Sequence, residues 1–171
     1  ILGKDSENND TYSHIPLSGD KAMVAGEALT LVGSFDAKST DYKLRVQSNS
    51  AGKEVPFYIG HVEFSYDSTE LPPRAPALPF ETITFENGEL NGFGPRSNET
   101  VQVVNTDNHT EGGQYALLTT NRSEHWNGPI ISIAQYLEEG VTYKFSAWVK
   151  LASAPEGYPS VPLKLTFEEN G

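Results

Sequence analysis

Short segments of alternating apolar and polar residues fill most of the chain, and no long amphipathic helical stripe accompanies them. A period of two places one face of a strand against a core and the other in solvent. The nearest candidate for a helix, Ile133–Glu139, is long enough for one or two turns. Many short strands without intervening helices predict an all-β sandwich or barrel. The predicted strands are Ala28–Phe35, Tyr42–Gln47, Phe57–Phe64, Thr100–Val104, Tyr115–Thr119, Ile130–Ile133, Thr142–Leu151 and Val161–Phe167.

The charge and the missing cysteines exclude several classes of partner and site. The 171 residues include 23 Asp and Glu against 12 Lys and Arg, which gives a formal net charge of -11. Phosphate backbones and anionic membrane surfaces both attract clustered Lys and Arg, so we expect neither nucleic acid nor membrane as a partner. The chain has no cysteine, which excludes disulfides, thiolate metal sites and a cysteine nucleophile. No run of eighteen apolar residues occurs, so no transmembrane helix is expected.

A proline-rich stretch, Ser68–Pro79, separates two strand-rich portions, 1–67 and 80–171. It carries four prolines in twelve residues. Proline fixes φ and lacks a backbone donor, so this composition predicts a stiff extended linker. Each portion alone is small for an independent sandwich.

Five motifs follow one another in the second portion. They are FENG at Phe85–Gly88, GPRS at Gly94–Ser97, EGGQYAL at Glu111–Leu117, NRSEHWNGP at Asn121–Pro129 and GVTYKFSAWVK at Gly140–Lys150. This succession resembles the N-terminal half of a carbohydrate-binding module of family 22, a module found beside xylanase catalytic domains. The first portion resembles the C-terminal half of the same family, through Thr11–Ile15, Val24–Phe35, Tyr42–Gln47 and Phe57–Val62. The resemblance therefore implies halves in swapped order, which joining Gly171 to Ile1 would restore.

Two explanations fit the swapped order. The chain is a circular permutant with Ser68–Pro79 bridging the old ends, or it is a fragment of two tandem modules cut in the same loop of each. The halves then complement each other within a monomer or across a half-swapped dimer. Either way, the resemblance implies one jelly-roll β-sandwich. Its predicted core contains Leu31, Phe35, Phe57, Ile59, Val62, Leu117, Tyr143, Phe145, Trp148, Leu163 and Leu165.

The resemblance implies a sugar site whose residues come from both portions. Sugars have apolar C–H faces and many hydroxyls, so a site needs an aromatic plate and positioned polar groups. The predicted contacts are Trp126, Arg96, Tyr12, Gln47 and Asn127. A half-buried Trp, a surface Arg and a strand-edge Tyr are the structural alternatives.

One strand departs from the family pattern. The family places sugar-facing Tyr and Glu side chains on the strand that matches Tyr42–Gln47, where this chain has Lys43, Arg45 and Gln47. Losing an aromatic plate costs on the order of 1–3 kcal/mol of apolar contact. This departure predicts weakened xylan binding, or none.

The family also carries a structural calcium held by hard oxygen ligands. The resemblance assigns to it the carboxylate of Glu86 and the backbone carbonyls near His109 and Gly112. The aspartate expected on the last family strand is missing, because Gly60-His61 stands there. Glu63 or Asp107 would have to substitute for it.

No enzymatic motif accompanies these features. The adjacent pairs Glu138-Glu139 and Glu168-Glu169 would point to opposite faces of a strand or into solvent at a turn, so a catalytic carboxylate pair is not expected. We therefore predict a non-catalytic, secreted module that binds xylan or mixed-linkage β-glucan and targets a plant-cell-wall hydrolase to its substrate. The alternatives are a structural, stabilising module that has lost sugar binding and a protein-binding β-sandwich.

Overall fold

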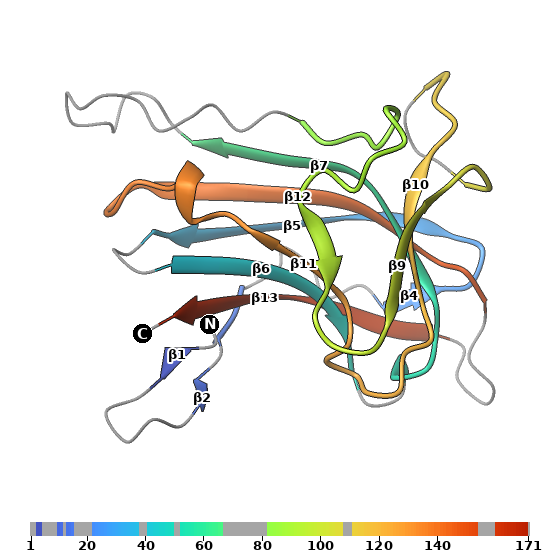
Figure 1. Ribbon diagram of the computed structural model, residues 1–171, viewed down its shortest axis with the longest axis horizontal. Helices are drawn as coiled ribbons and strands as arrows, with labels where there is room; N and C mark the ends of the chain where they lie inside the picture. The colour runs from blue at the N-terminus through green and yellow to red at the C-terminus, as the bar shows by residue number, and fades with distance from the viewer. Residues whose placement is uncertain are drawn as a thin grey trace.

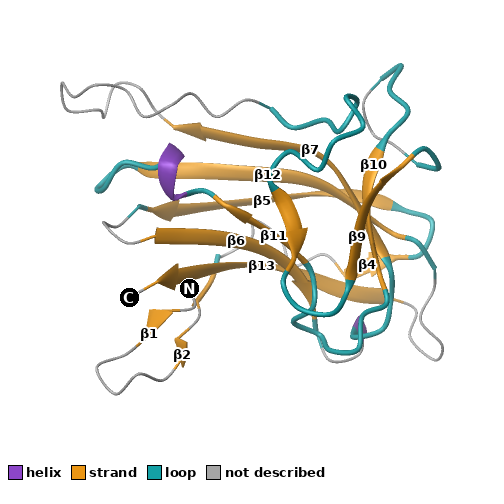
Figure 2. Cartoon of the chain, in the orientation of Figure 1, coloured by secondary structure: helices purple, strands orange, loops and turns teal. Residues whose placement is uncertain are grey.

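The computed structural model describes residues 3–4, 10–11, 13–15, 22–37, 41–49, 52–66, 82–107, 111–153 and 160–170. Strands dominate this part of the chain, as Figure 2 shows. The strands are β1 Gly3–Lys4, β2 Asp10–Thr11, β3 Ser13–His14, β4 Ala22–Val24, β5 Ala28–Asp36, β6 Asp41–Ser48, β7 Phe57–Tyr66, β8 Phe93–Pro95, β9 Thr100–Val104, β10 Ala116–Thr120, β11 Pro129–Ser132, β12 Thr142–Leu151 and β13 Ser160–Asn170. A 3-10 turn, η3 Ala134–Tyr136, lies where the sequence predicted at most two helical turns.

Two antiparallel sheets form a β-sandwich, which confirms the predicted fold class (Figure 1). One sheet has the strand order β5-β12-β7-β10-β9. The other has the order β3-β13-β6-β11-β8, with β4 paired to β13. All eight predicted strands are present, with ends that differ by at most a few residues. The predicted strands do not include β8 or the short strands β1 to β4, because segments of two or three residues are too short to show a period.

Strands from the two portions of the chain are hydrogen-bonded neighbours in both sheets. In the first sheet β12 lies between β5 and β7, and in the second β6 lies between β13 and β11. The portions 1–67 and 80–171 therefore share one hydrogen-bonded framework. The proline-rich stretch Ser68–Pro79 lies outside the described residues. The swapped order of the halves stays a prediction.

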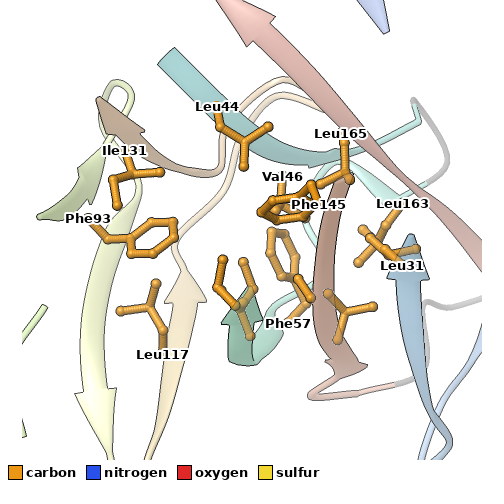
Figure 3. Close-up of a cluster of buried hydrophobic side chains, with 14 of the residues drawn as sticks. Leu31, Leu44, Val46, Phe57, Phe93, Leu117, Ile131, Phe145, Leu163 and Leu165 are labelled. Atoms are coloured by element: carbon orange, nitrogen blue, oxygen red, sulfur yellow. The ribbon is translucent and has the colours of Figure 1, made fainter. Parts of the chain in front are cut away.

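The core lies between the sheets, where side chains from both portions converge (Figure 3). Phe57 and Phe145 are almost completely buried there, beside Leu44 and Val46 of β6. The predicted core residues are buried, except for Phe35, which packs against the core while partly exposed. Tyr143 is buried in a smaller cluster with Ala37 and Val141.

Trp148 is buried at 5% exposure but belongs to neither core cluster. The buried side chains of β12 that face the core are at odd positions, from Tyr143 to Leu151. Trp148 therefore lies on the opposite face of this sheet. Its strand neighbours are Gly60 and Thr30, at a point where the pairing of β12 and β7 shifts register.

Helices long and apolar enough to cross a membrane do not occur in the described part of the chain.

Candidate functional site

A hollow of about 440 Å³ lies over β8, β11 and β6, on the outward face of the second sheet. Gly94 of β8 stands opposite Ile130 of β11, and Ser132 of β11 stands opposite Lys43 of β6. These four residues line the hollow together with Arg96. A side chain at Gly94 would meet no atom within 4 Å of its Cβ. The missing side chain at this position therefore helps to keep the hollow open.

The face of the sheet follows from strand alternation. Phe93, Ile131 and Leu44 stand side by side across the same three strands and are buried in the core. Their immediate neighbours along each strand point the other way. Gly94, Ile130 and the residues in register with them therefore face outward.

Two residues that the sequence predicted for the site contact each other beside the hollow, which Arg96 lines and Trp126 does not. Arg96 follows β8 directly, and Trp126 lies in the loop between β10 and β11. The guanidinium carbon of Arg96 lies 5.1 Å from the centre of the Trp126 ring. Both side chains are half-buried. A cation over an indole face is attracted by the electron density of the ring, and the contact fixes the orientation of both groups.

Glu99 holds the segment of Arg96 and the segment of Trp126 together. Its buried carboxylate accepts hydrogen bonds from the backbone N–H groups of Arg96 at 2.5 Å, of Ser97 at 3.2 Å and of Gly128 at 3.0 Å. Bonds from N–H groups to a carboxylate are stronger than those between neutral groups. Glu99 thus positions the two site residues without facing the hollow itself.

Arg122 anchors the Trp126 loop to the first portion of the chain. Its guanidinium donates to the carbonyls of Gly52 and Val55, at 2.7 and 2.8 Å. It also donates to Ser48 Oγ and to the carbonyls of His125 and Asn127, and it lies 4.8 Å from the centre of the Phe57 ring. Burial lowers the pKa of Arg122 to about 10, and the charge of Glu99 opposes this shift. The side chain therefore stays protonated at neutral pH.

Two predicted sugar contacts are buried instead of lining the hollow. Asn127 is 1% exposed, and its Oδ1 accepts hydrogen bonds from the N–H groups of Ser123 and Glu124 and from Ser123 Oγ. It closes the turn that carries Trp126. Gln47 is 4% exposed and stands opposite Lys164 on the outward face. Its Oε1 is buried and accepts no hydrogen bond from the described residues. Neither side chain is presented to a ligand in this conformation.

Gly128 lets the Trp126 loop lie directly against β6. A Cβ at this position would lie 1.9 Å from the carbonyl oxygen of Val46. We expect Gly128→Ala to lower the free energy of unfolding by about 2–3 kcal/mol, because backbone would have to shift. Gly94→Ala is the matched control, since its Cβ would enter open space. Urea denaturation of both variants measures the difference, and equal stability would contradict the close approach.

The calcium ligands are only partly described. Glu86 accepts backbone hydrogen bonds from Gln114 at 2.7 Å and Tyr115 at 3.4 Å, which places it beside the loop that contains Gly112. His109 lies outside the described residues. The residues considered as substitutes have other partners: Asp107 pairs with Lys150 at 2.6 Å, and Glu63 lies 3.8 Å from His61.

Within the described part of the chain, no cluster of three or more His, Asp or Glu side chains could hold a metal ion. The predicted calcium site combines the carboxylate of Glu86 with backbone carbonyls, which such a cluster does not include. The ion stays a prediction from the resemblance. Tyr12, the second predicted aromatic contact, also lies outside the described residues.

Sequence reasoning missed the floor of the hollow and its support. Gly94, Ile130 and Ser132 line the hollow, and Glu99 holds its rim. Their residue types are ordinary for strands and turns. Gly94, which precedes Pro95, was the available sign in the sequence that a strand position here lacks a side chain.

Recessed sites that combine apolar surface with a few positioned polar groups suit small ligands and sugars. Residues 80–171 match a family model described as a carbohydrate binding domain. The match covers more than half of the chain, so the protein belongs to this family of carbohydrate-binding domains.

The curated relatives are regions of much longer proteins. The chain is 36% identical over 70 residues to endo-1,4-beta-xylanase A of Thermoanaerobacterium saccharolyticum, covering 41% of this chain and 6% of the xylanase. It is 29% identical over 118 residues to endo-1,4-beta-xylanase A of Thermotoga maritima, covering 68% of this chain and 10% of the xylanase. The chain thus spans about a tenth or less of these relatives. No solved structure matches it significantly.

Proposed function

We propose that this chain is a non-catalytic module of the family 22 type that binds xylan or mixed-linkage β-glucan. In its parent protein it would hold a secreted plant-cell-wall hydrolase on its substrate. The similarity to short regions of xylanases supports this assignment. The observation that carries it is an open hollow lined by Arg96, whose guanidinium contacts the half-buried Trp126 beside it.

The chemistry of the hollow suits a sugar chain. Ile130 gives an apolar patch on its floor, which suits the C–H face of a pyranose ring. Ser132, Lys43 and Arg96 supply hydrogen-bond donors for hydroxyl groups. Trp126 offers a large aromatic surface, of which the guanidinium of Arg96 covers part. A sugar would stack on the remaining surface or displace the guanidinium.

The swapped order of the halves is part of this proposal. β1 and β13, the first and last strands, lie against each other (Figure 1). At the other junction, Ile83 pairs with Val62 of β7, so the chain returns to the strand that it left at Tyr66. Both observations suit a circularly permuted sandwich. In such a sandwich, a linker joins the two ends of the unpermuted module, and the first and last strands of the permuted chain lie next to each other. Sedimentation of the purified chain distinguishes a monomer from a half-swapped dimer.

Affinity electrophoresis in gels that contain soluble xylan or barley β-glucan tests the binding function. We expect the wild-type protein to migrate more slowly in one of these gels than in a gel without glycan. Unchanged mobility in both gels would contradict the proposal.

Gly94→Leu tests whether the hollow is the binding site. A leucine at this position would fill the hollow without displacing described atoms near its Cβ, and a larger side chain suits a strand better than glycine does. We expect retardation in the glycan gel to be lost while the unfolding temperature stays within about 3 °C of the wild type. Full retention of glycan binding would place the site elsewhere.

A second candidate function is a structural module that has lost sugar binding. The burial of Gln47 and Asn127 favours it, because two predicted sugar contacts are withdrawn from solvent. This candidate predicts no retardation on xylan, β-glucan or galactan. Measurable binding to any of the three would exclude it.

A further inference from the structure

Two cationic side chains line the hollow of a protein whose net charge is -11. They are Lys43 of β6 and Arg96, which follows β8, and none of the described lining residues is acidic. Lys164 stands opposite Gln47 on the same outward face, whereas Arg45, opposite Ile130, is 3% exposed. Of the three positions that match sugar-facing positions of the resembling family, Lys43 and Arg45 are cationic and Gln47 is neutral.

Glu99, the acid that follows Arg96 in the sequence, is buried and accepts backbone N–H groups. Glu168 stands opposite Lys43 in the strand register.

We propose that the hollow binds a carboxylate carried by the glycan, so that the module prefers xylan substituted with uronic acid over neutral xylan. The inference rests on the proposed glycan-binding function and names its substrate class. A guanidinium can donate two parallel hydrogen bonds to a carboxylate, and an ammonium adds a point charge. Lys43 supplies the ammonium group and Arg96 the guanidinium group, and both residues line the hollow.

The Trp126 contact strengthens this assignment. The ring holds the guanidinium of Arg96 beside the hollow, and Glu99 fixes the Arg96 backbone. A preorganised donor loses less side-chain freedom on binding than a mobile surface arginine does. The uncharged floor at Gly94 and Ile130 leaves room for the sugar ring that bears the carboxylate.

Binding is measured by isothermal titration calorimetry at about 0.15 M salt, where screening acts over about 8 Å. The probes are glucuronoxylan, the same polymer after reduction of its carboxylates to alcohols, and polygalacturonate. We expect the wild type to bind glucuronoxylan about 5- to 10-fold more tightly than its reduced form. Lys43→Gln and Arg96→Gln should each bring this ratio close to one. Lys144→Gln, which removes an exposed cation from the other sheet, should leave the ratio unchanged.

The other possible results of the calorimetry contradict the proposal in different ways. Equal binding of glucuronoxylan and its reduced form would overturn the carboxylate preference and leave the proposed function intact. Binding to neither would overturn both. If Lys43→Gln and Arg96→Gln left the ratio of the two affinities unchanged, the carboxylate would bind outside this hollow, and the proposal would be overturned. Binding of polygalacturonate as tight as that of glucuronoxylan would indicate general attraction to polyanions and would also overturn the proposal.

Discussion

Replacing Arg122 by alanine is expected to lower the free energy of unfolding by about 3–5 kcal/mol. The side chain is 4% exposed and donates to five acceptors on three segments of the chain. Alanine would leave these buried acceptors without a donor and would open a cavity beside Phe57. Guanidinium chloride denaturation, followed by tryptophan fluorescence, measures the loss.

Two further variants separate this mechanism from a simple loss of charge. Arg122→Lys keeps the charge, but an ammonium has three donors and no planar fork, so a large part of the loss should remain. Lys144→Ala removes an exposed cation and should change the stability by less than about 0.5 kcal/mol. A loss below about 1 kcal/mol for Arg122→Ala would show that the network is not structural.

Replacing Trp126 by alanine is expected to weaken glycan binding by about tenfold or more, which corresponds to about 1.5–3 kcal/mol. The substitution removes the aromatic surface and also releases Arg96, whose guanidinium lies 5.1 Å from the ring centre. Affinity electrophoresis across a series of xylan concentrations measures the change. Trp126→Phe keeps a smaller aromatic face and should retain part of the affinity.

A loss of stability could imitate this loss of binding, so both must be measured. Trp126 is half-buried in a loop that Arg122, Asn127 and Glu99 hold in place. Its replacement should therefore cost less stability than the replacement of Arg122. If the folded Trp126→Ala variant bound glycan as tightly as the wild type, the tryptophan would have no part in the site.

The strands were predictable because their pattern is local. β12 has the predicted ends, Thr142 and Leu151, and all but one of its predicted inward positions are in the core clusters. Trp148 shows the limit of such reasoning. It was among the predicted core residues. It is buried on the other face of the sheet, opposite Gly60, which no local pattern shows.

The site was predictable only in part, for the same reason. Arg96 and Trp126 were named from motifs, but their mutual contact depends on Glu99 and on the pairing of β8 with β11. Asn127 belongs to the same motif as Trp126, and its side chain turns inward to close the loop. A sequence motif shows which residues lie close together along the chain. It does not show in which direction each side chain of a turn points.

The alternation of apolar residues by itself determined an all-β fold, a sandwich or a barrel, because strand periodicity depends on neighbours along the chain. The tertiary structure decided which strands adjoin, since both sheets combine strands of portions 1–67 and 80–171. It also decided that Lys43 and Arg96, far apart in sequence, line one hollow. Such proximity arises from pairing between distant strands, which minimises exposed apolar surface over the whole chain and not within any one segment.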